Sequence, residues 1–400
     1  MNYGMIVRHS FSLRALAIAT SALVFASSTH AAEPPKAADA TPEFRVRFLK
    51  FCDLAAGELR KEMSPFRLKE RQYADPKTHH MPAFEDAHAV RALAVAYDLT
   101  GDRQYLDACK LWSDRMIAYQ KGMIPKGAYY MNHSRAPGED RGEWNVADSG
   151  SVGMAVLATA VRCERPQEKA RYLDSTKAFA KLVMENYVGP EGGITNGCWS
   201  GYRGQWWCST ATAGSLLLLL HDETGDPSCL RAGRRALEWM VRQDFRQVKP
   251  INFQQRPSGI VFYCFEFYAT GLRHLEPNSE SYRLAKAQIA EAVQWMNEHP
   301  ITQGPTGDWD QFDIHTDMAG LPYLKYSLAR QLPEYRELAA AADRDLAATG
   351  AWLLRNGDPP VSRLIPWEVM SWGMLSYAEK LSPGALYRKS GGLTPRDGSR

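Results

Sequence analysis

A short segment that occurs twice in the chain restricts the fold more than any other feature of the sequence. Residues 97–102 read Tyr-Asp-Leu-Thr-Gly-Asp, and residues 221–226 read His-Asp-Glu-Thr-Gly-Asp. In each segment the glycine can supply the left-handed residue that ends one helix, and the aspartate after it can cap the next helix. So short a connection makes the two flanking helices antiparallel neighbours. The recurrence therefore predicts helical hairpins.

Apolar residues recur at helical spacing almost everywhere after Thr41, whereas the alternating runs of β-strands are nearly absent. A single hairpin cannot bury its own apolar face, and the even-numbered helices are the more apolar, so six hairpins favour closure with those helices inside. The predicted fold is therefore all-α, a single-domain (α/α)6 toroid over residues 42–382, with an open solenoid as the alternative. The twelve helices are expected near 42–63, 84–100, 102–121, 146–163, 166–187, 207–223, 226–246, 258–274, 278–298, 313–330, 332–355 and 364–380.

The first residues of the chain have the pattern of an export signal. Arg8 and Arg14 accompany an apolar run over residues 15–26, and small residues at 29–32 suit a cleavage site. At roughly a dozen residues the run is too short to span a bilayer as a helix. We expect a signal peptide over 1–32, a disordered leader over 33–41 and a C-terminal tail over 383–400. The predicted location is periplasmic or secreted, with no membrane attachment after signal removal and a retained anchor as the alternative.

Charge and cysteine content exclude several classes of partner. The net charge of +3 comes from interleaved residues of both signs, so no basic stripe predicts nucleic-acid binding, and any anionic ligand must be held by a few local arginines. The seven cysteines are not spaced as a disulfide framework, and no zinc-type cluster occurs among the cysteines and histidines. Cys198 and Cys208 flank one loop and form the single pair that we consider for a disulfide. The sequence makes no prediction of the oligomeric state.

The connections that lead into the even-numbered helices combine tryptophan, carboxylate, arginine and histidine. In a closed toroid these connections lie together at one end. Sugar rings stack their apolar faces on tryptophan and offer hydroxyls to polar side chains, so this mixture is typical of a saccharide cleft. The alternative is that the tryptophans only plug the end of the ring. The candidate sugar-binding residues are His88, Trp144, Arg203, Gln205, Trp207, Arg256, Trp309 and Trp367.

Two aspartates occupy equivalent positions one hairpin repeat apart. Asp86 and Asp148 each lie in the first turn of an expected inner helix, so a closed ring would bring both carboxylates to one cavity. Helix capping and favourable first-turn charge are the alternative roles. A general acid must hold its proton near neutral pH, which a helix N-terminus opposes. Apolar walls such as Trp144 and a nearby second carboxylate would have to counter that effect.

Several motifs between residues 84 and 225 occur together in one order. They are residues 84–88 running to the turn at 97–102, the helix start at Asp148, the Gly-Pro-Glu-Gly-Gly stretch at 189–193 and above all Arg-Gly-Gln-Trp-Trp at 203–207. In these motifs the chain resembles the unsaturated glucuronyl hydrolases and their unsaturated rhamnogalacturonyl hydrolase relatives. In that family a histidine usually precedes the first aspartate directly, whereas here Glu85 does and His88 follows. A tryptophan expected two residues before the arginine is replaced by Gly201.

The resemblance implies an enzyme that removes the 4,5-unsaturated uronic acid left at the non-reducing end of oligosaccharides by polysaccharide lyases. In the family, an aspartate matching Asp148 protonates the enol-ether double bond and activates water, and the resulting hemiketal collapses to release the sugar. An aspartate matching Asp86 assists in the same cavity, while Arg203 and Trp207 match residues that hold and stack the sugar. The implied partner is an acidic oligosaccharide or polysaccharide, and no metal or organic cofactor is implied.

Three other functions remain open from the residues alone. A polysaccharide lyase on the same toroid would need a carboxylate neutraliser, a base and an acid, for which the candidates are Asn132, His133, Arg256 and Tyr263. An inverting glycosidase would use two carboxylates separated by a water molecule, drawn from Asp86, Glu143, Asp148, Asp310, Asp313 and Glu368. A non-catalytic saccharide-binding protein would keep the tryptophans and arginines without needing Asp148.

Overall fold

The computed structural model describes residues 41–61, 83–131, 144–197, 204–243, 258–298, 312–353 and 367–387. Over these residues the chain forms twelve α-helices, close to the twelve predicted. They are α1 (Thr41–Leu59), α2 (Ala83–Thr100), α3 (Arg103–Gly122), α4 (Val146–Ala160), α5 (Pro166–Asn186), α6 (Trp207–Thr224), α7 (Pro227–Val241), α8 (Ser258–Gly271), α9 (Glu280–Glu298), α10 (Phe312–Gln331), α11 (Leu338–Leu353) and α12 (Trp367–Leu381).

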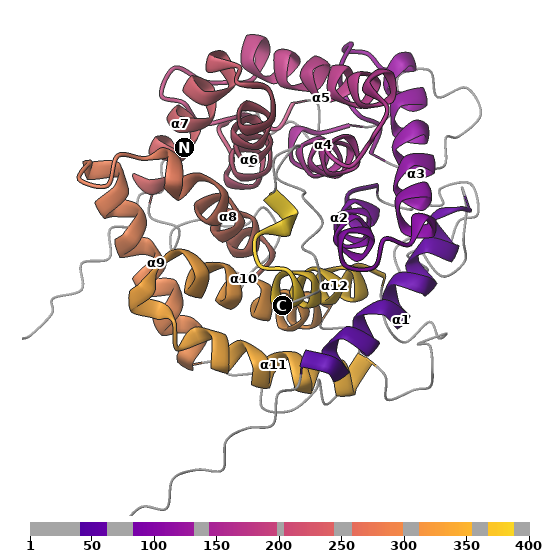
Figure 1. Ribbon diagram of the computed structural model, residues 1–400. Coiled ribbons are helices and arrows are strands. Elements are labelled where there is room, and N and C mark those ends of the chain that lie inside the picture. The colour runs from indigo at the N-terminus through magenta and orange to yellow at the C-terminus, as the bar shows by residue number, and fades with distance from the viewer. Residues whose placement is uncertain are drawn as a thin grey trace, which may run out of the picture. The chain divides into compact units, whose positions relative to one another are not determined.

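The even-numbered helices form a closed inner ring, and the odd-numbered helices surround it (Figure 1). Each inner helix packs on the next one in the chain, from α2 to α12, and α12 packs back on α2. The described helices therefore form an (α/α)6 toroid, the fold that the sequence predicts. Ion pairs near the C-terminal ends of neighbouring inner helices show that these helices run parallel. Asp98 pairs with Arg162 at the ends of α2 and α4, and Asp222 pairs with Arg273 at the ends of α6 and α8.

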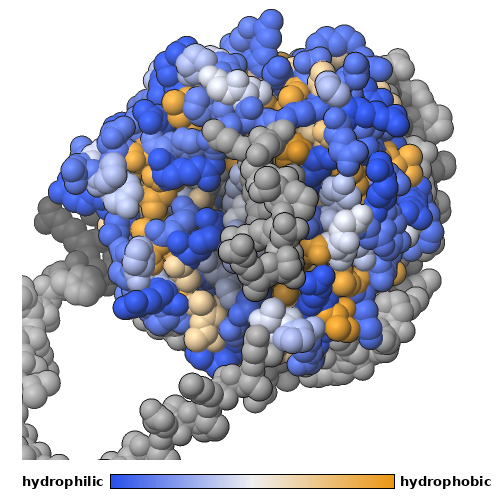
Figure 2. Space-filling view, in the orientation of Figure 1, coloured by the Kyte–Doolittle hydropathy of each residue, from blue (hydrophilic) through white to orange (hydrophobic). Residues whose placement is uncertain are grey.

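Inner and outer helices differ in burial because only the inner ones are covered on all sides. In α6, every residue from Trp207 to Leu220 is buried. In the outer helix α7 the buried residues recur at helical spacing, as Cys229, Gly233, Ala236 and Met240 do. The opposite faces of the outer helices carry charge, and hydrophilic side chains dominate the face of the molecule drawn in Figure 2.

Two inner helices approach closely through glycine. A Cβ atom added to Gly150 of α4 would lie 2.7 Å from Oγ1 of Thr212 and 2.8 Å from the backbone nitrogen of Ala213, both on α6. Separations under about 3 Å are not tolerated between nonbonded heavy atoms of this kind, so a side chain at residue 150 would force the helices apart. The spacing of α4 and α6, which both begin near the candidate site, therefore depends on this glycine.

At the end where the inner helices finish, the structure confirms the predicted hairpin turns. Gly101 and Gly225 have φ angles of 70° and 76°, the left-handed conformation that glycine adopts without steric cost. Asp102 then accepts a hydrogen bond from the backbone nitrogen of Gln104 at 2.9 Å, and Asp226 caps α7 in the same way. These caps hold each inner helix next to its outer partner.

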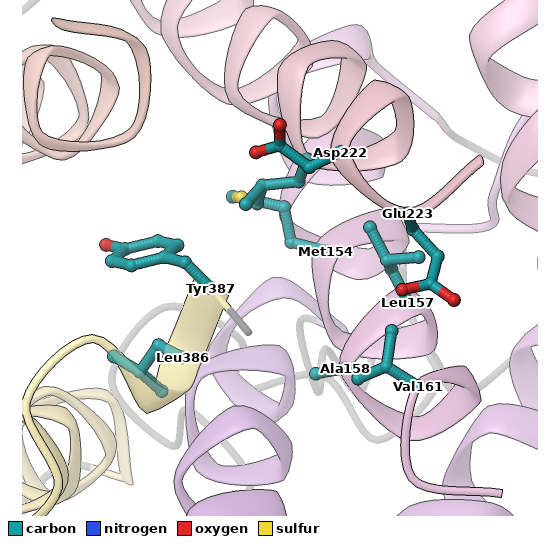
Figure 3. Close-up of a pocket in the computed structure, with 9 residues that line it drawn as sticks. Met154, Leu157, Ala158, Val161, Asp222, Glu223, Leu386 and Tyr387 are labelled. Carbon is teal, nitrogen blue, oxygen red and sulfur yellow. The ribbon is translucent and has the colours of Figure 1, made fainter. Parts of the chain in front are cut away.

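The packed structure continues beyond residue 382, where we expected the tail to begin. A 3₁₀ helix, η5 (Ala385–Tyr387), packs against α2 and α12. Arg162 donates to the backbone oxygen of Ala385 at 3.0 Å while it pairs with Asp98. A cavity of about 20 Å³ lies beside this segment between α4 and α6 (Figure 3). It has room for about one water molecule, and its two carboxylates, Asp222 and Glu223, are already ion-paired.

Two further predictions concern the cysteines and the membrane. Cys208 is a buried free thiol, whereas Cys198, the other member of the pair considered for a disulfide, lies outside the described residues. Across the described part of the chain, no helix combines the length and the apolar character needed to span a membrane. The expected signal peptide and leader, residues 1–41, lie outside the described ranges except for Thr41, which begins α1.

Candidate active site

The first turns of α4 and α6 are joined by buried asparagines. Asn145 caps α4, because its Oδ1 accepts from the backbone nitrogen of Asp148 at 2.7 Å. Oδ1 of Asn196 accepts from the backbone nitrogen of Ala147 at 3.3 Å and from the hydroxyl of Ser209 on α6 at 2.6 Å. These bonds fix the starts of two neighbouring inner helices relative to each other, and with them the position of Asp148.

Asp148 is half-buried in the first turn of α4. Burial raises the pKa of the Cys208 thiol well above its usual range, and the negative charge of Asp148 contributes to this rise. The interaction indicates that Asp148 lies near the first turn of α6, where Cys208 is found. A half-buried carboxylate at the start of an inner helix is a candidate for general acid–base chemistry.

Asp86 is fully buried in the first turn of α2. Its Oδ2 accepts from Nε1 of Trp112, at 3.1 Å, on the outer helix α3. A buried indole N–H requires an acceptor, and this requirement turns the fully buried Asp86 toward the outer layer of the toroid. That Asp86 lies in one cavity with Asp148 stays a prediction. On α2, Asp86 lies about 200° around the helix from His88, which faces the ring axis.

His88 lies on the axis of the ring, where three inner helices meet. Its imidazole lies 4.2 Å from the ring of Trp372 on α12, centroid to centroid, and its Nε2 lies 3.4 Å from the hydroxyl of Tyr263 on α8. His88 is fully buried, whereas Tyr263 is half-buried. Burial lowers the pKa of His88 well below its usual range, and the positive charge of Arg91 lowers it further. His88 is therefore a neutral imidazole near neutral pH.

A buried ionic layer lies one helical turn below His88. Arg91 of α2 forms an ion pair with Glu266 of α8, and both side chains are 1% exposed. Glu266 also accepts from the hydroxyl of Tyr323 on α10 at 2.9 Å and from that of Tyr387 in η5 at 3.5 Å. A buried ion pair persists only when its remaining hydrogen-bonding capacity is largely satisfied. This layer fills the centre of the ring and separates His88 from the opposite end.

Several predicted sugar-binding residues make packing contacts in the structure, and their role in sugar binding stays a prediction. Trp207 packs edge-to-face on Trp239 of the outer helix α7, and Trp144 packs on Tyr187; both Trp207 and Trp144 are buried. A Cβ on Gly189 would lie 2.0 Å from the amide nitrogen of Gln205, and one on Gly193 would lie 2.6 Å from its amide oxygen, so the glycine-rich turn encloses this side chain.

Of the remaining predicted sugar-binding residues, the structure describes Trp367. Trp367 is 3% exposed at the start of α12. The predicted sugar-binding residues Arg203, Arg256 and Trp309 and the lyase candidates Asn132 and His133 lie outside the described residues. No cluster of histidine, cysteine, aspartate and glutamate suited to a metal ion occurs among the residues that are described.

Sequence reasoning missed the residues at the ring axis. Trp372, Arg91, Glu266 and Tyr323 all contribute to it, and none was a candidate. A signal was present, because a charged residue within an otherwise apolar, wholly buried helix is rarely found without a partner. Arg91 and Glu266 are both of this kind, although their pairing joins helices far apart in the sequence and cannot be derived from spacing.

Comparison with known proteins supports the fold and leaves the sequence relationship distant. No family model matches the chain, and no curated protein matches it by sequence. An unsaturated glucuronyl hydrolase from a Bacillus species, described as responsible for glycosaminoglycan degradation, is 15% identical, with 88% of this chain and 100% of that chain covered and a TM-score of 0.57. An unsaturated glucuronyl hydrolase specific for heparin is 13% identical, with coverage of 86% and 97% and a TM-score of 0.57.

Glycosidases of another specificity share the fold to the same degree. An α-1,6-mannanase of glycoside hydrolase family 76 from a Salegentibacter species is 12% identical, with 84% of this chain and 98% of that chain covered and a TM-score of 0.56. Because these matches cover most of both chains, the toroid of this protein is the fold that all three enzymes share. The resemblance to unsaturated glucuronyl hydrolases is thus supported at the level of the fold.

Proposed function

We propose that this protein is a glycoside hydrolase that removes a 4,5-unsaturated uronic acid from the non-reducing end of polysaccharide-derived oligosaccharides. The observation that carries the proposal is the position of Asp148, a half-buried carboxylate locked at the start of an inner helix. The fold is one that unsaturated glucuronyl hydrolases also adopt. We further propose that the chain acts after export, at the location predicted from its N-terminal residues.

In the proposed reaction Asp148 acts first as an acid and then as a base. Its carboxyl group gives a proton to the enol-ether double bond of the sugar, and the resulting carboxylate takes a proton from the water that adds to the bond. The hemiketal formed in this way opens and collapses, which releases the remaining saccharide. The sum of these steps consumes one water molecule and regenerates the protonated Asp148, so the reaction needs no oxidant or reductant.

The orientation of Asp86 bears on the choice among hydrolases. An inverting glycosidase places two carboxyl groups on opposite sides of the scissile bond, about 6.5–9.5 Å apart. Asp86 accepts a hydrogen bond from Trp112 of the outer layer, so one of its two carboxylate oxygens is already engaged. Hydration of a double bond can proceed with a single carboxyl group, which is the role that we propose for Asp148.

One observation favours a polysaccharide lyase as a second candidate. The hydroxyl of Tyr263 lies 3.4 Å from Nε2 of His88, and a phenol beside an imidazole can abstract or donate a proton in a β-elimination. Of the residues predicted for a lyase, Tyr263 is the one that the structure describes. A lyase would create the conjugated double bond that the proposed hydrolase removes, so the two functions have opposite spectroscopic effects.

The test is to follow ultraviolet absorbance of the conjugated double bond with purified protein. We expect a fall with lyase-cut uronic-acid oligosaccharides and no change with the intact polysaccharides. Asp148→Asn should lower the rate by about 100-fold to 10,000-fold, the usual contribution of a general acid-base group, while calorimetry shows retained oligosaccharide binding. Asp174→Asn, at a side chain that is 75% exposed on α5, is the matched control and should act as the wild type does.

Each other outcome contradicts the proposal in a distinct way. A rise in absorbance with intact polysaccharide would identify a lyase. Full activity in Asp148→Asn would remove Asp148 from the mechanism. Binding without any change in absorbance, in the wild type and in Asp148→Asn alike, would indicate a saccharide-binding protein or a conventional glycosidase, which release of reducing ends from saturated oligosaccharides would distinguish.

A further inference from the structure

The cluster of His88, Tyr263 and Trp372 combines a buried imidazole with a half-buried hydroxyl, a combination that packing alone does not require. Its members come from three inner helices, and two of them are fully buried, while Tyr263 is half-buried. His88, Tyr263 and Trp372 each lie in the second turn of an inner helix, counted from the starts of α2, α8 and α12, and Asp148 lies in the first turn of α4. Because the inner helices run parallel, the cluster lies at the same end of the ring as Asp148, and Tyr263 is its half-buried member.

We propose that Tyr263 donates a hydrogen bond to the bound sugar and that His88 is the positioning residue that directs its hydroxyl. This inference rests on the proposed function, and it assigns a contact to the saccharide that Asp148 acts upon. The ligand atom is an oxygen, either a hydroxyl or the carboxylate of the uronic acid, because a phenol O–H is a good donor to both.

The direction of the hydrogen bond between the two side chains follows from the burial of His88. A neutral imidazole carries one N–H and one bare nitrogen. Nδ1 of His88 is buried and meets no hydrogen-bond partner. A buried N–H left unpaired is rarer than an unpaired acceptor, so the proton belongs on Nε2, which faces Tyr263 at 3.4 Å. His88 is then the donor, and the proton of the Tyr263 hydroxyl must point away from His88.

The surroundings hold His88 in the orientation that this arrangement needs. Trp372 covers one face of the imidazole at 4.2 Å, and Phe84 approaches it edge-on at 6.4 Å. Arg91, fixed by its ion pair with Glu266, opposes protonation of the imidazole. A charged His88 would donate from both nitrogens and would bury an uncompensated positive charge, so Arg91 preserves the single-donor state. The ring of Tyr263 packs edge-on against Trp372 at 5.7 Å independently of its hydroxyl.

The test compares kcat and KM of four variants on lyase-cut oligosaccharides. Tyr263→Phe removes the hydroxyl and keeps the ring, so kcat/KM should fall about 10-fold to 100-fold, the effect of losing one good hydrogen bond to a polar or charged ligand, with the melting temperature almost unchanged. Tyr326→Phe is the matched control. Its hydroxyl donates to Asp343 at 2.6 Å between α10 and α11, so kcat/KM should stay within about twofold of the wild type.

A second pair of variants tests the positioning role of His88. Glutamine can present an amide N–H to Tyr263, whereas leucine cannot, so His88→Gln should retain most of the activity that His88→Leu loses. This rescue is not expected if His88 only fills space, and the pair carries the test if Tyr263→Phe does not fold. Wild-type activity in Tyr263→Phe, or equal losses in His88→Gln and His88→Leu, would overturn this inference alone. An inactive wild type would overturn the proposed function and this inference with it.

Discussion

The two ends of the toroid are built differently from the same helices. Where the inner helices finish, short turns capped by Asp102 and Asp226 join them to their outer partners, and charged pairs such as Arg162 with Asp98 link neighbouring inner helices. Where they begin, the connections are longer, and Asp148 and Tyr263 are half-buried. One end therefore carries the caps and ion pairs of the hairpins, and the other end carries the candidate catalytic and sugar-binding residues.

The ionic layer of Arg91 and Glu266 lies between these two ends of the toroid. It joins inner helices, as the ion pairs of one end do, and it adjoins His88 of the other end. It is fully buried and joins α2 to α8 across the ring, as a structural pair does. It also lies one turn from His88 and contacts Tyr387 of η5 at the opposite end. Substitutions at the two ends should thus separate stability from activity, and those near the layer should affect both.

The largest effect is expected at the closed end, from Arg162→Met. The guanidinium donates to both oxygens of Asp98, at 2.6–3.1 Å, and to the backbone oxygens of Ala158 and Ala385. Its removal leaves the largely buried Asp98 carboxylate unpaired, which typically costs about 3–5 kcal/mol of unfolding free energy. Urea denaturation should show this loss, while kcat on oligosaccharide substrates stays within about twofold of the wild type.

Lys177→Met serves as the control for the loss of a charge. Its pair with Asp174 is 4.0 Å long and exposed, so the change in unfolding free energy should stay below about 0.5 kcal/mol. If Arg162→Met also lowered kcat by much more than about twofold, the two ends of the toroid would be coupled. That result would refute the separation of stability at one end from activity at the other.

The fold could be predicted from the sequence because its determinants are local. A left-handed glycine, an aspartate cap and an apolar period of 3.6 residues each act within a few residues, and Gly101 with Asp102 shows all that is needed for one hairpin. Closure followed from burial, since the inner helices are apolar on every side. The twelve predicted helices therefore correspond to the twelve described ones, although some predicted ends differ from the observed ones, as at the start of α11, predicted at 332 and observed at Leu338.

The candidate site could be predicted only in part, because side-chain direction depends on distant partners. One residue step turns a side chain by 100° around a helix, so a motif near the start of α2 cannot by itself show whether Asp86 or His88 faces the axis. The choice is made by Trp112 and Trp372, which attract one side chain each. Trp207 likewise has the sequence context of a sugar-stacking residue, and in the structure its ring packs edge-to-face on Trp239 of α7.

A smaller loss of stability, together with a loss of activity, is expected from Gly150→Ala, where α4 and α6 meet. The new methyl group would lie within 2.8 Å of α6, so the helices must move apart, at a cost of about 1–3 kcal/mol in unfolding free energy. Asp148 lies two residues earlier on the same helix, and displacements of this size can lower kcat by about 100-fold. Denaturation and steady-state kinetics on the same preparation would measure both losses.

Gly101→Ala is the matched glycine control at the other end. Its added Cβ would have no neighbour within 4 Å, but its φ of 70° is unfavourable for alanine, so about 1–2 kcal/mol should be lost. Because the strain lies at the closed end, kcat should be unchanged. If Gly150→Ala also left kcat unchanged, the position of Asp148 would not depend on the contact between α4 and α6.

The smallest effect should appear in the pH dependence of stability, through His88. Its pKa is lowered by burial first and by Arg91 second, whereas in the unfolded chain it should titrate near its usual value of about 6.5. Below that pH the unfolded state binds a proton that the native state excludes, so stability is fully present above about pH 6.5 and falls as the pH drops toward the native pKa. His88→Gln lacks this dependence, so the stability difference between wild type and variant should be constant above pH 6.5 and shift against the wild type below it. Urea denaturation of both proteins across this range would measure the shift, and parallel curves would mean that folding does not lower the pKa of His88, contrary to the effect expected from its burial and from Arg91.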